Sequence, residues 1–456
     1  MASIPRSMSV DTFSVPTTIE WLVGTDRSFA FLGVDVNGNA HRFDGHDPTQ
    51  SILLTNSNGL NPDTPLMAEL DSNATLVPLP QPVSVSTLST AVPLPDGGRL
   101  FVNKQQRVTQ LRPDGTDVTV ADVSAIPDPL LDGQITYSHA NGLWALYAKS
   151  TRDRYIHGIL GDFFEGYALY VLRWHNETGL VGVEASTTLE GGSLVFEGLA
   201  PLWADVNGDG IDDILTTVAQ DRDGAGLRLY FVTKEGTSNG TIAGVPTYRL
   251  DGLPFASSGF IGTSDRWLHQ LAVGPLGPNG ETEIVEIRTP HIGGIVRYYR
   301  WNSGSNELDL VARANSDYTS HDIGSRNLDQ AVVADLNGDG ILELVVQNQG
   351  ESAVFGLQRC TTDGVGVAWK VDMPGRLQSN VALSCTDQGK DNATIGLLMS
   401  TNNQRIIQLT FRPDVNSTII GCTSNAFAGT TRIPVLDGMV GAVATVMSML
   451  LITWVR

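Results

Sequence analysis

Two short acidic segments of the chain carry the residue types that bind a hard cation. They read ADVNGDGIDD at 204–213 and ADLNGDGILE at 334–343. Each places oxygen side chains at loop positions one, three and five, a glycine at position six and a carboxylate at position nine. With the main-chain carbonyl of position seven, these groups can surround Ca²⁺, which takes six to eight oxygen ligands. The two segments therefore predict calcium-binding loops, and ordinary Asn-, Asp- and Gly-rich turns are the simpler alternative.

The residues that follow each segment distinguish it from an EF-hand. An EF-hand has a bidentate glutamate at loop position twelve and helices on both sides. Position twelve is Thr216 in the first segment and Val346 in the second. The chain then continues with ILTTV or LVV, which are residues typical of strands. Each loop is therefore expected to connect two strands.

A third segment, GPLGPNGETEIV at 274–285, aligns with the two loops when Pro275 is placed at position one. Its ligand positions hold Pro275, Gly277 and Asn279, so the turn is kept and the cation site is not. The three segments are about 70 and about 60 residues apart, a spacing that suits one four-stranded propeller blade. We therefore predict an all-β fold, a β-propeller of about seven four-stranded blades, with six or eight as alternatives.

The loop pattern D-x-N-x-D-G-x-x-[DE], with a small residue before it and a buried strand after it, resembles the FG-GAP or VCBS repeat of integrin α-chain propellers. The resemblance covers about two blades. It implies two Ca²⁺ sites, with Ile211 and Ile341 contributing main-chain carbonyls. The implied ligands are Asp205, Asn207, Asp209, Ile211 and Asp213 in the first site, and Asp335, Asn337, Asp339, Ile341 and Glu343 in the second.

Composition agrees with a large β-rich protein. The chain has 456 residues, of which 41% are hydrophobic, with 48 glycines and 22 prolines, which suits many short strands joined by turns. The formal net charge is −20. Nucleic acids and anionic membrane surfaces favour clustered Lys and Arg, so nucleic acid is not expected as a partner.

The last residues form an apolar segment that is a candidate membrane anchor. Residues 439–455 contain no charged side chain, and 17 residues is the short end of a membrane-spanning helix. A transmembrane helix, a GPI-type signal and a buried element that closes the propeller are the three interpretations. We expect a propeller over 18–420, a linker over 421–438 and a hydrophobic, membrane-attached helix over 439–456.

The N-terminal residues 1–17 are rich in Ser, Thr and Pro and are expected to be disordered, with no recognisable signal peptide. An extracellular or cell-surface location is still expected, and five N-glycosylation sequons would suit it. The sequons begin at Asn73, Asn176, Asn239, Asn392 and Asn416.

No catalytic motif is recognisable, since the chain lacks G-x-S-x-G, H-E-x-x-H and a Gly-rich phosphate loop. Histidines 157, 269, 291 and 321 lie near predicted strand ends, where a propeller could bring them to one face. Trp174, Trp203, Trp267 and Trp301 could line a sugar-binding surface, although packing between blades is the simpler explanation.

Two classes of function follow. The favoured one is a non-catalytic, calcium-binding surface propeller that binds a protein or glycan ligand on one face. The alternative is a carbohydrate-active propeller enzyme, a polysaccharide lyase or hydrolase, that uses histidines and acidic residues on its central face.

Overall fold

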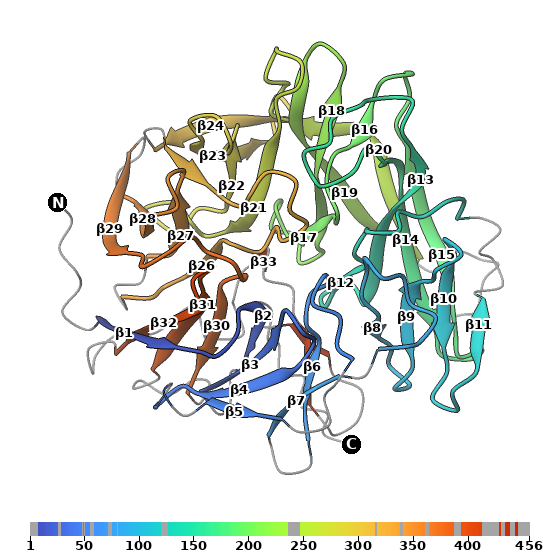
Figure 1. The fold of residues 1–456 in the computed structure, drawn as a ribbon. Helices are drawn as coiled ribbons and strands as arrows, with labels where there is room; N and C mark the ends of the chain where they lie inside the picture. The colour runs from blue at the N-terminus through green and yellow to red at the C-terminus, as the bar shows by residue number, and fades with distance from the viewer. Residues whose placement is uncertain are drawn as a thin grey trace.

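The structure is a computed structural model. It describes residues 8–25, 29–47, 49, 51–54, 59–71, 75–79, 81–119, 126–235, 247–314, 317–337, 341–360, 364–386, 394–412, 428–429, 434–437 and 443–445. These residues form strands and loops and no helix. The strands assemble into sheets arranged as a ring, and the chain passes around the ring in sequence order (Figure 1).

Five sheets are separate blades of the ring. The first is β2 (Ile19–Gly24), β3 (Ala30–Asp35), β4 (Ala40–Asp44) and β5 (Ser51–Leu53). The second is β8 (Val92–Pro93), β9 (Arg99–Val102), β10 (Val108–Leu111) and β11 (Asp117–Thr119). The third is β21 (Leu268–Gly274), β22 (Glu283–Arg288), β23 (Ile295–Asn302) and β24 (Glu307–Arg313), and β33 (Ala428–Gly429) pairs with β21.

The remaining two separate blades come from residues between Tyr318 and Phe411 and from the N-terminal strand of the chain. One is β26 (Val332–Ala334), β27 (Glu343–Asn348), β28 (Ala353–Arg359) and β29 (Val365–Asp372), with β25 (Tyr318–Thr319) also paired to β27. The other is β30 (Ala382–Cys385), β31 (Ile395–Ser400) and β32 (Arg405–Phe411), completed by β1 (Met8–Ser14). In this last sheet Met8 pairs with Phe411 and Ser14 with Arg405, so the two ends of the ring are joined by hydrogen bonds.

A nine-stranded sheet contains two meanders. They are β12 (Thr136–Ser138), β13 (Leu143–Thr151), β14 (Glu165–His175) and β15 (Leu180–Thr188), and then β17 (Leu202–Ala204), β18 (Asp213–Gln220), β19 (Gly224–Glu235) and β20 (Thr247–Ser257). The short strand β16 (Val195–Phe196) pairs with both β14 and β18 and joins the meanders. A seventh sheet contains β6 (Ala68–Leu70), β7 (Leu76–Pro78), β34 (Pro434–Asp437) and β35 (Val443–Thr445).

The all-β propeller is therefore confirmed, but the prediction of about seven separate four-stranded blades is wrong. Among the described residues there are five separate blades, because β16 fuses two meanders into one sheet and the seventh sheet includes two strands of the C-terminal segment. Residues 8–14, expected to be disordered, form β1. The described residues 443–445 of the expected C-terminal helix are strand β35, and the other residues of 439–456 lie outside the described ranges. Within those ranges no helix has the length and apolar character needed to cross a bilayer.

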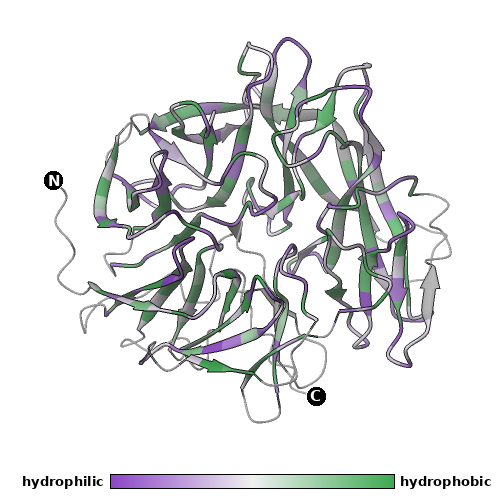
Figure 2. Cartoon of the chain, viewed as in Figure 1, coloured by the Kyte–Doolittle hydropathy of each residue, from purple (hydrophilic) through white to green (hydrophobic). Residues whose placement is uncertain are grey.

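The burial pattern explains why these segments are strands of a propeller. All seven residues of the innermost strand β21 are buried, whereas in the outermost strand β24 two buried residues stand among exposed or partly exposed ones. Such a mixture is expected for a strand with one face in solvent. Hydrophobic residues accordingly concentrate in the strands rather than in the connecting loops (Figure 2).

The antiparallel order sorts the loops into two groups. In each four-stranded blade, the loop between the second and third strands emerges at the same end as the connection into the next innermost strand. The loops between the first and second strands emerge at the opposite end. The acidic segments 205–212 and 335–342 belong to the second group, because they connect β17 with β18 and β26 with β27.

Candidate functional site

The first acidic loop is held together by its own side chains. The Asp205 carboxylate accepts hydrogen bonds from the amides of Gly208 (2.8 Å), Asp209 (3.1 Å) and Gly210 (2.9 Å). The Asn207 side-chain oxygen accepts a further bond from the Asp209 amide at 2.9 Å. Gly208 and Gly210 have φ values of 78° and 84°, a conformation that glycine adopts without strain. The sequence pattern thus produces a tight turn between β17 and β18.

The position-nine carboxylate of this loop, Asp213, is fully buried. It accepts hydrogen bonds from the amides of Val206 (3.3 Å) and Val232 (3.1 Å). Burial raises the pKa of Asp213 to about 7, and the nearby Asp209 and Asp205 add to this increase. No lysine or arginine of the described residues forms an ion pair with Asp213.

The second acidic loop repeats one of these contacts. The Leu336 amide donates to the Glu343 carboxylate at 2.7 Å, in the position that corresponds to Val206 and Asp213. Asp335 and Glu343 are both fully buried. Of the other predicted ligands of this loop, Asn337 and Ile341 are among the described residues. Asp339 lies in 338–340, outside the described residues.

The third, degenerate loop provides a comparison within the same chain. Its position-nine residue, Glu283, is also fully buried, but it pairs with two arginines. Arg359, which is 1% exposed, donates to it from Nε at 2.9 Å and from Nη2 at 3.3 Å, and Arg300 donates at 2.7 Å. A buried carboxylate requires a compensating positive charge or several hydrogen bonds. Where the cation ligands are missing from the sequence, arginines supply that charge.

The acidic side chains of the described residues do not converge on one point. No group of three His, Cys, Asp or Glu side chains in the described ranges is arranged to hold a metal ion. In the first loop, the Asp205 oxygens are occupied by amides instead. Asp213 has no ion-pair partner among the described residues, and the side-chain arrangement by itself does not form a complete cation site.

The opposite end of the propeller brings together the four histidines that the sequence singled out. The ring of Trp267 is nearly parallel to the rings of His269 and His291, with centroids 5.1 Å and 6.1 Å away. His321 contacts Trp267, His269 and His291, with centroid distances of 4.9, 5.9 and 4.6 Å. We call this end of the propeller the histidine face.

His157 joins the histidine face from the loop between β13 and β14. Its Nδ1 lies 2.5 Å from Oε1 of Glu197, whose side chain is fully buried. The indole nitrogen of Trp267 donates to the main-chain oxygen of Glu197 at 3.0 Å and connects this pair to the other histidines. Burial raises the pKa of Glu197 to about 7, although the hydrogen bond from His157 acts in the opposite direction.

Glu165 is a second buried carboxyl group beside Glu197. Gly166 pairs with Phe196 in the antiparallel contact of β14 and β16, which places Glu165 opposite Glu197. Glu165 is 3% exposed. Burial raises its pKa well above the ordinary value, and the charges of Glu197, Asp132 and Asp162 add to the shift. Two buried carboxylates this close repel each other, which disfavours the ionisation of both.

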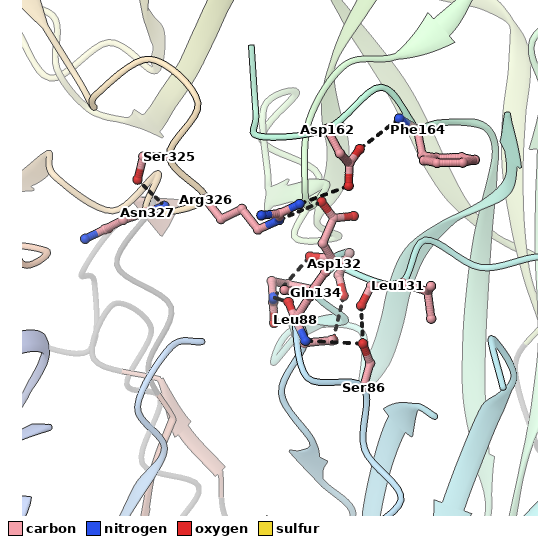
Figure 3. Close-up of polar contacts among 12 residues, drawn as sticks. Ser86, Leu88, Leu131, Asp132, Gln134, Asp162, Phe164, Ser325, Arg326 and Asn327 are labelled. Carbon is pink, nitrogen blue, oxygen red and sulfur yellow. Dashed lines mark hydrogen bonds and ion pairs between the residues drawn. The ribbon is translucent and has the colours of Figure 1, made fainter. Parts of the chain in front are cut away.

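Arg326 connects loops from opposite sides of the ring at this face (Figures 1 and 3). It extends from the connection before β26 and donates to Asp132 at 3.1 Å and to Asp162 at 2.9 Å. The amide of Gly324 in the same connection donates to the carbonyl of Ile159 at 2.9 Å. Burial and the charge of Asp162 raise the pKa of Asp132 to about 6, and Arg326 opposes this increase.

Large hydrophobic side chains are exposed around the histidine cluster. Those in loops that carry cluster or clamp residues are Leu131, Ile156, Phe163, Phe164, Ile292 and Ile323, with exposed fractions between 37% and 69%. We call these six residues the apolar rim. Val36 and Val83 are exposed in other loops of the same end, and the remaining exposed large hydrophobics, Val10, Ile52, Leu53, Leu310 and Val367, lie on outermost strands.

The sequence identified some of these residues and missed others. Histidines 157, 269, 291 and 321 and Trp267 do meet, whereas Trp174, Trp203 and Trp301 pack with hydrophobic residues of the blades. No sequence pattern singles out the other residues of this face, Glu165, Glu197, Asp132, Asp162 and Arg326. Isolated charged residues next to strands were the only available signal for them.

The ring of sheets defines the protein as a β-propeller. No family model matches the chain, and a search of curated proteins finds no match. Among solved structures, one described as the structure of the Dos1 propeller shares 10% sequence identity, covers 88% of this chain and 97% of its own, and has a TM-score of 0.40. That similarity concerns the fold alone.

Proposed function

We propose that this propeller is a recognition module that binds a protein partner through the histidine face. The observation that carries the proposal is the apolar rim, because its exposed large hydrophobics lie on loops of one end of the propeller. Contiguous exposed apolar groups on a soluble protein are typical of interaction sites. Phenylalanine and isoleucine side chains of this kind suit a protein surface better than a sugar.

Charge indicates the chemistry of the partner. Asp132 and Asp162 beside the rim are paired with Arg326, and Asp322 is paired with Arg376, but the whole chain has a net charge of −20. A partner that presents apolar side chains flanked by Lys or Arg would be attracted by this net negative charge. Acidic or phosphorylated segments would be repelled.

Calcium has a structural role in this proposal. Two ions, one at each acidic loop, would balance buried carboxylates in the way that Arg300 and Arg359 balance Glu283. The loops lie at the end opposite the histidine face, so calcium would stabilise blades without contacting the partner. Attachment to a membrane through residues 439–456 also belongs to the proposal and places the propeller at a cell surface.

The test compares exposed hydrophobic residues of the apolar rim with equally exposed hydrophobic residues on outermost strands. Phe163 and Phe164 are 54% and 48% exposed, and Leu53 and Leu310, on outermost strands, are 54% and 47% exposed. The parent protein is used to select peptides from a displayed random library. The selected peptides are then measured against Phe163→Ser/Phe164→Ser and Leu53→Ser/Leu310→Ser.

The proposal expects apolar, basic peptides that bind the parent and the outer-strand variant equally and the rim variant at least about tenfold more weakly, since central apolar anchors dominate binding. Equal binding to all three proteins would overturn it. A glycan that binds on an array and depends on the rim, with no such peptide, would replace the protein partner with a glycan.

A second candidate function is catalysis, by an enzyme whose active site lies at the histidine face. The specific observation in its favour is the short hydrogen bond between half-buried His157 and fully buried Glu197. A histidine oriented by a buried carboxylate is a common arrangement for acid–base chemistry.

A further inference from the structure

We propose that His157, positioned by Glu197, is the general base of a hydrolytic site that takes neutral carboxylic esters. This inference rests on the second candidate function, an enzyme at the histidine face, and it does not depend on the binding of a protein partner. It assigns the reacting group, the positioning group and the class of substrate.

The contact with Glu197 indicates which imidazole nitrogen would react. Nδ1 of His157 lies 2.5 Å from Oε1 of Glu197, and when Glu197 is ionised its carboxylate accepts the proton of Nδ1. Nε2 on the opposite edge of the ring is then the acceptor in the neutral form. The His157 side chain is 15% exposed, whereas that of Glu197 is completely buried, so the imidazole stands between the carboxylate and the solvent.

Glu197 is held in place and cannot turn away from His157 freely. Its amide donates to the carbonyl of Thr217 at 3.1 Å, and its own carbonyl accepts from Trp267 at 3.0 Å. The preceding residue, Phe196, stacks on Tyr147 with a centroid distance of 4.8 Å and an angle of 11° between the rings. A base whose orientation is fixed in advance avoids reorganisation during the reaction.

The electrostatic setting supports the protonated form of His157. Burial by itself lowers the pKa of His157, and the charge of Arg266 also lowers it, but the hydrogen bond and the charge of Glu197, with the charge of Asp265, raise it above the ordinary value. The imidazolium that forms during catalysis therefore has a compensating negative charge within hydrogen-bond distance. Glu197 acts here as a positioning residue, because it does not reach the substrate.

The proposed reaction is a hydrolysis in which atoms and protons balance. Nε2 of His157 removes a proton from a water molecule while the water oxygen forms a bond to the carbonyl carbon of the ester. The bond between that carbon and the alcohol oxygen then breaks. The imidazolium gives its proton to the departing alkoxide, which leaves as the alcohol, and the other product is the carboxylic acid.

The surroundings select a neutral substrate with an apolar part. Glu197 and Asp265 lie near the base and would repel phosphate esters and other anions, whereas the nearby Arg266 acts in the opposite direction. Ile156 is the neighbour of His157 and Ile292 that of His291, and both are more than 60% exposed. An ester with an apolar acyl or alcohol group, including an O-acylated sugar, fits these groups.

A second histidine–carboxylate pair of the chain provides the control. Nε2 of His41 lies 2.9 Å from Asp35, but both side chains are buried, with exposed fractions of 5% and 2%. His41→Gln therefore removes a comparable hydrogen bond from a place that substrate does not reach. His157→Gln removes the proposed base, and Glu197→Gln removes the charge behind it.

The probe is p-nitrophenyl butyrate, assayed on the full chain as a function of pH. We expect His157→Gln to lower kcat/KM by about a hundredfold or more, the usual contribution of a general base, and His41→Gln to leave it near the parent value. The parent rate should increase with pH as His157 loses its proton. Glu197→Gln should shift that transition to lower pH and lower the plateau, a change that a merely structural role would not produce.

Rescue keeps the test valid if a variant folds poorly. His157→Gly should recover activity when imidazole is added, because a free imidazole can occupy the vacated position. Equal kcat/KM for parent and His157→Gln, or no imidazole rescue of a folded His157→Gly, would overturn the inference.

A parallel panel of neutral and acidic polysaccharides separates the two levels of the claim. If His157→Gln abolishes cleavage of a polysaccharide while the ester is not hydrolysed by the parent, the enzyme stands and the ester class is wrong. If the parent cleaves neither kind of substrate, both the enzyme and this inference fail.

Discussion

Position nine of the acidic loops offers a matched pair of substitutions that tests calcium binding directly. Asp213 and Glu283 are the first residues of the second strands of their blades, and both side chains are fully buried. Glu283 is neutralised by Arg359 and Arg300, whereas among the described residues the partners of Asp213 are two main-chain amides. Asp213→Asn should therefore alter the response to calcium, and Glu283→Gln should alter stability without altering that response.

The expected magnitudes follow from these partners. Calcium at a hundred times its dissociation constant would stabilise the parent by about 2.7 kcal/mol per site, and Asp213→Asn should remove most of the contribution of the first site. In chelator the same substitution should cost little, because it removes a buried charge that has no cationic partner. Glu283→Gln leaves Arg359 buried without its carboxylate and should cost about 3–5 kcal/mol in calcium and in chelator alike.

Urea unfolding followed by tryptophan fluorescence measures these differences as shifts of the transition midpoint. Each protein is measured in calcium, in chelator and in magnesium, which separates a calcium effect from a general effect of divalent ions. An identical midpoint for the parent in calcium and in chelator would refute the reasoning. So would a full calcium response in Asp213→Asn.

Three further predictions concern the ring and the tail. Arg326→Leu should lower the free energy of unfolding by about 2 kcal/mol at pH 7. The loss should be smaller at pH 5, because Asp132, with a pKa of about 6, is then protonated and needs no counter-charge. Urea unfolding at both pH values measures this difference, and an equal loss at the two pH values would contradict it. Gly24→Ala should destabilise by about 1–3 kcal/mol, since its Cβ would lie 1.8 Å from a main-chain oxygen of the neighbouring blade, whereas Gly192→Ala, with no atom within 4 Å, should be neutral in thermal unfolding. Deletion of 439–456 should release the protein from membranes in fractionation, and a full-length chain that is already soluble would exclude the anchor.

The sequence could predict the parts of this molecule that are local. The acidic loops were visible because a cation site in one loop places its ligands within nine residues, and the all-β class was visible from short apolar segments between turns. The number of separate blades was not visible. It depends in part on the pairing of two residues, Val195 and Phe196, with two different strands, and no sequence pattern of that length specifies such a contact. It also depends on the pairing of the C-terminal strand β34 with β6, far away in the sequence.

The candidate site at the histidine face shows the same limit. The four histidines could be nominated because each lies near a strand end, but their partner Glu197 is one acidic residue in a short apolar stretch. Its importance comes from burial and from a contact with a residue 40 positions away. Arg326 is 194 positions from Asp132, so its role depends on the closure of the whole ring.

Closure of the ring also explains how the histidine face brings side chains of several blades together. The acidic loop at 205–212 bonds within itself, as the three amide contacts of Asp205 illustrate, and Asp212 also bonds to Ser138 and Asn141 of the preceding meander. At the histidine face, the connection that carries Gly324 and Arg326 reaches across the ring and binds the loop between β13 and β14 on the opposite side. For this reason a substitution of Asp205 should be felt mainly by its own blade, and a substitution of Arg326 should disturb His157 as well, because His157 lies in the loop that this arginine holds.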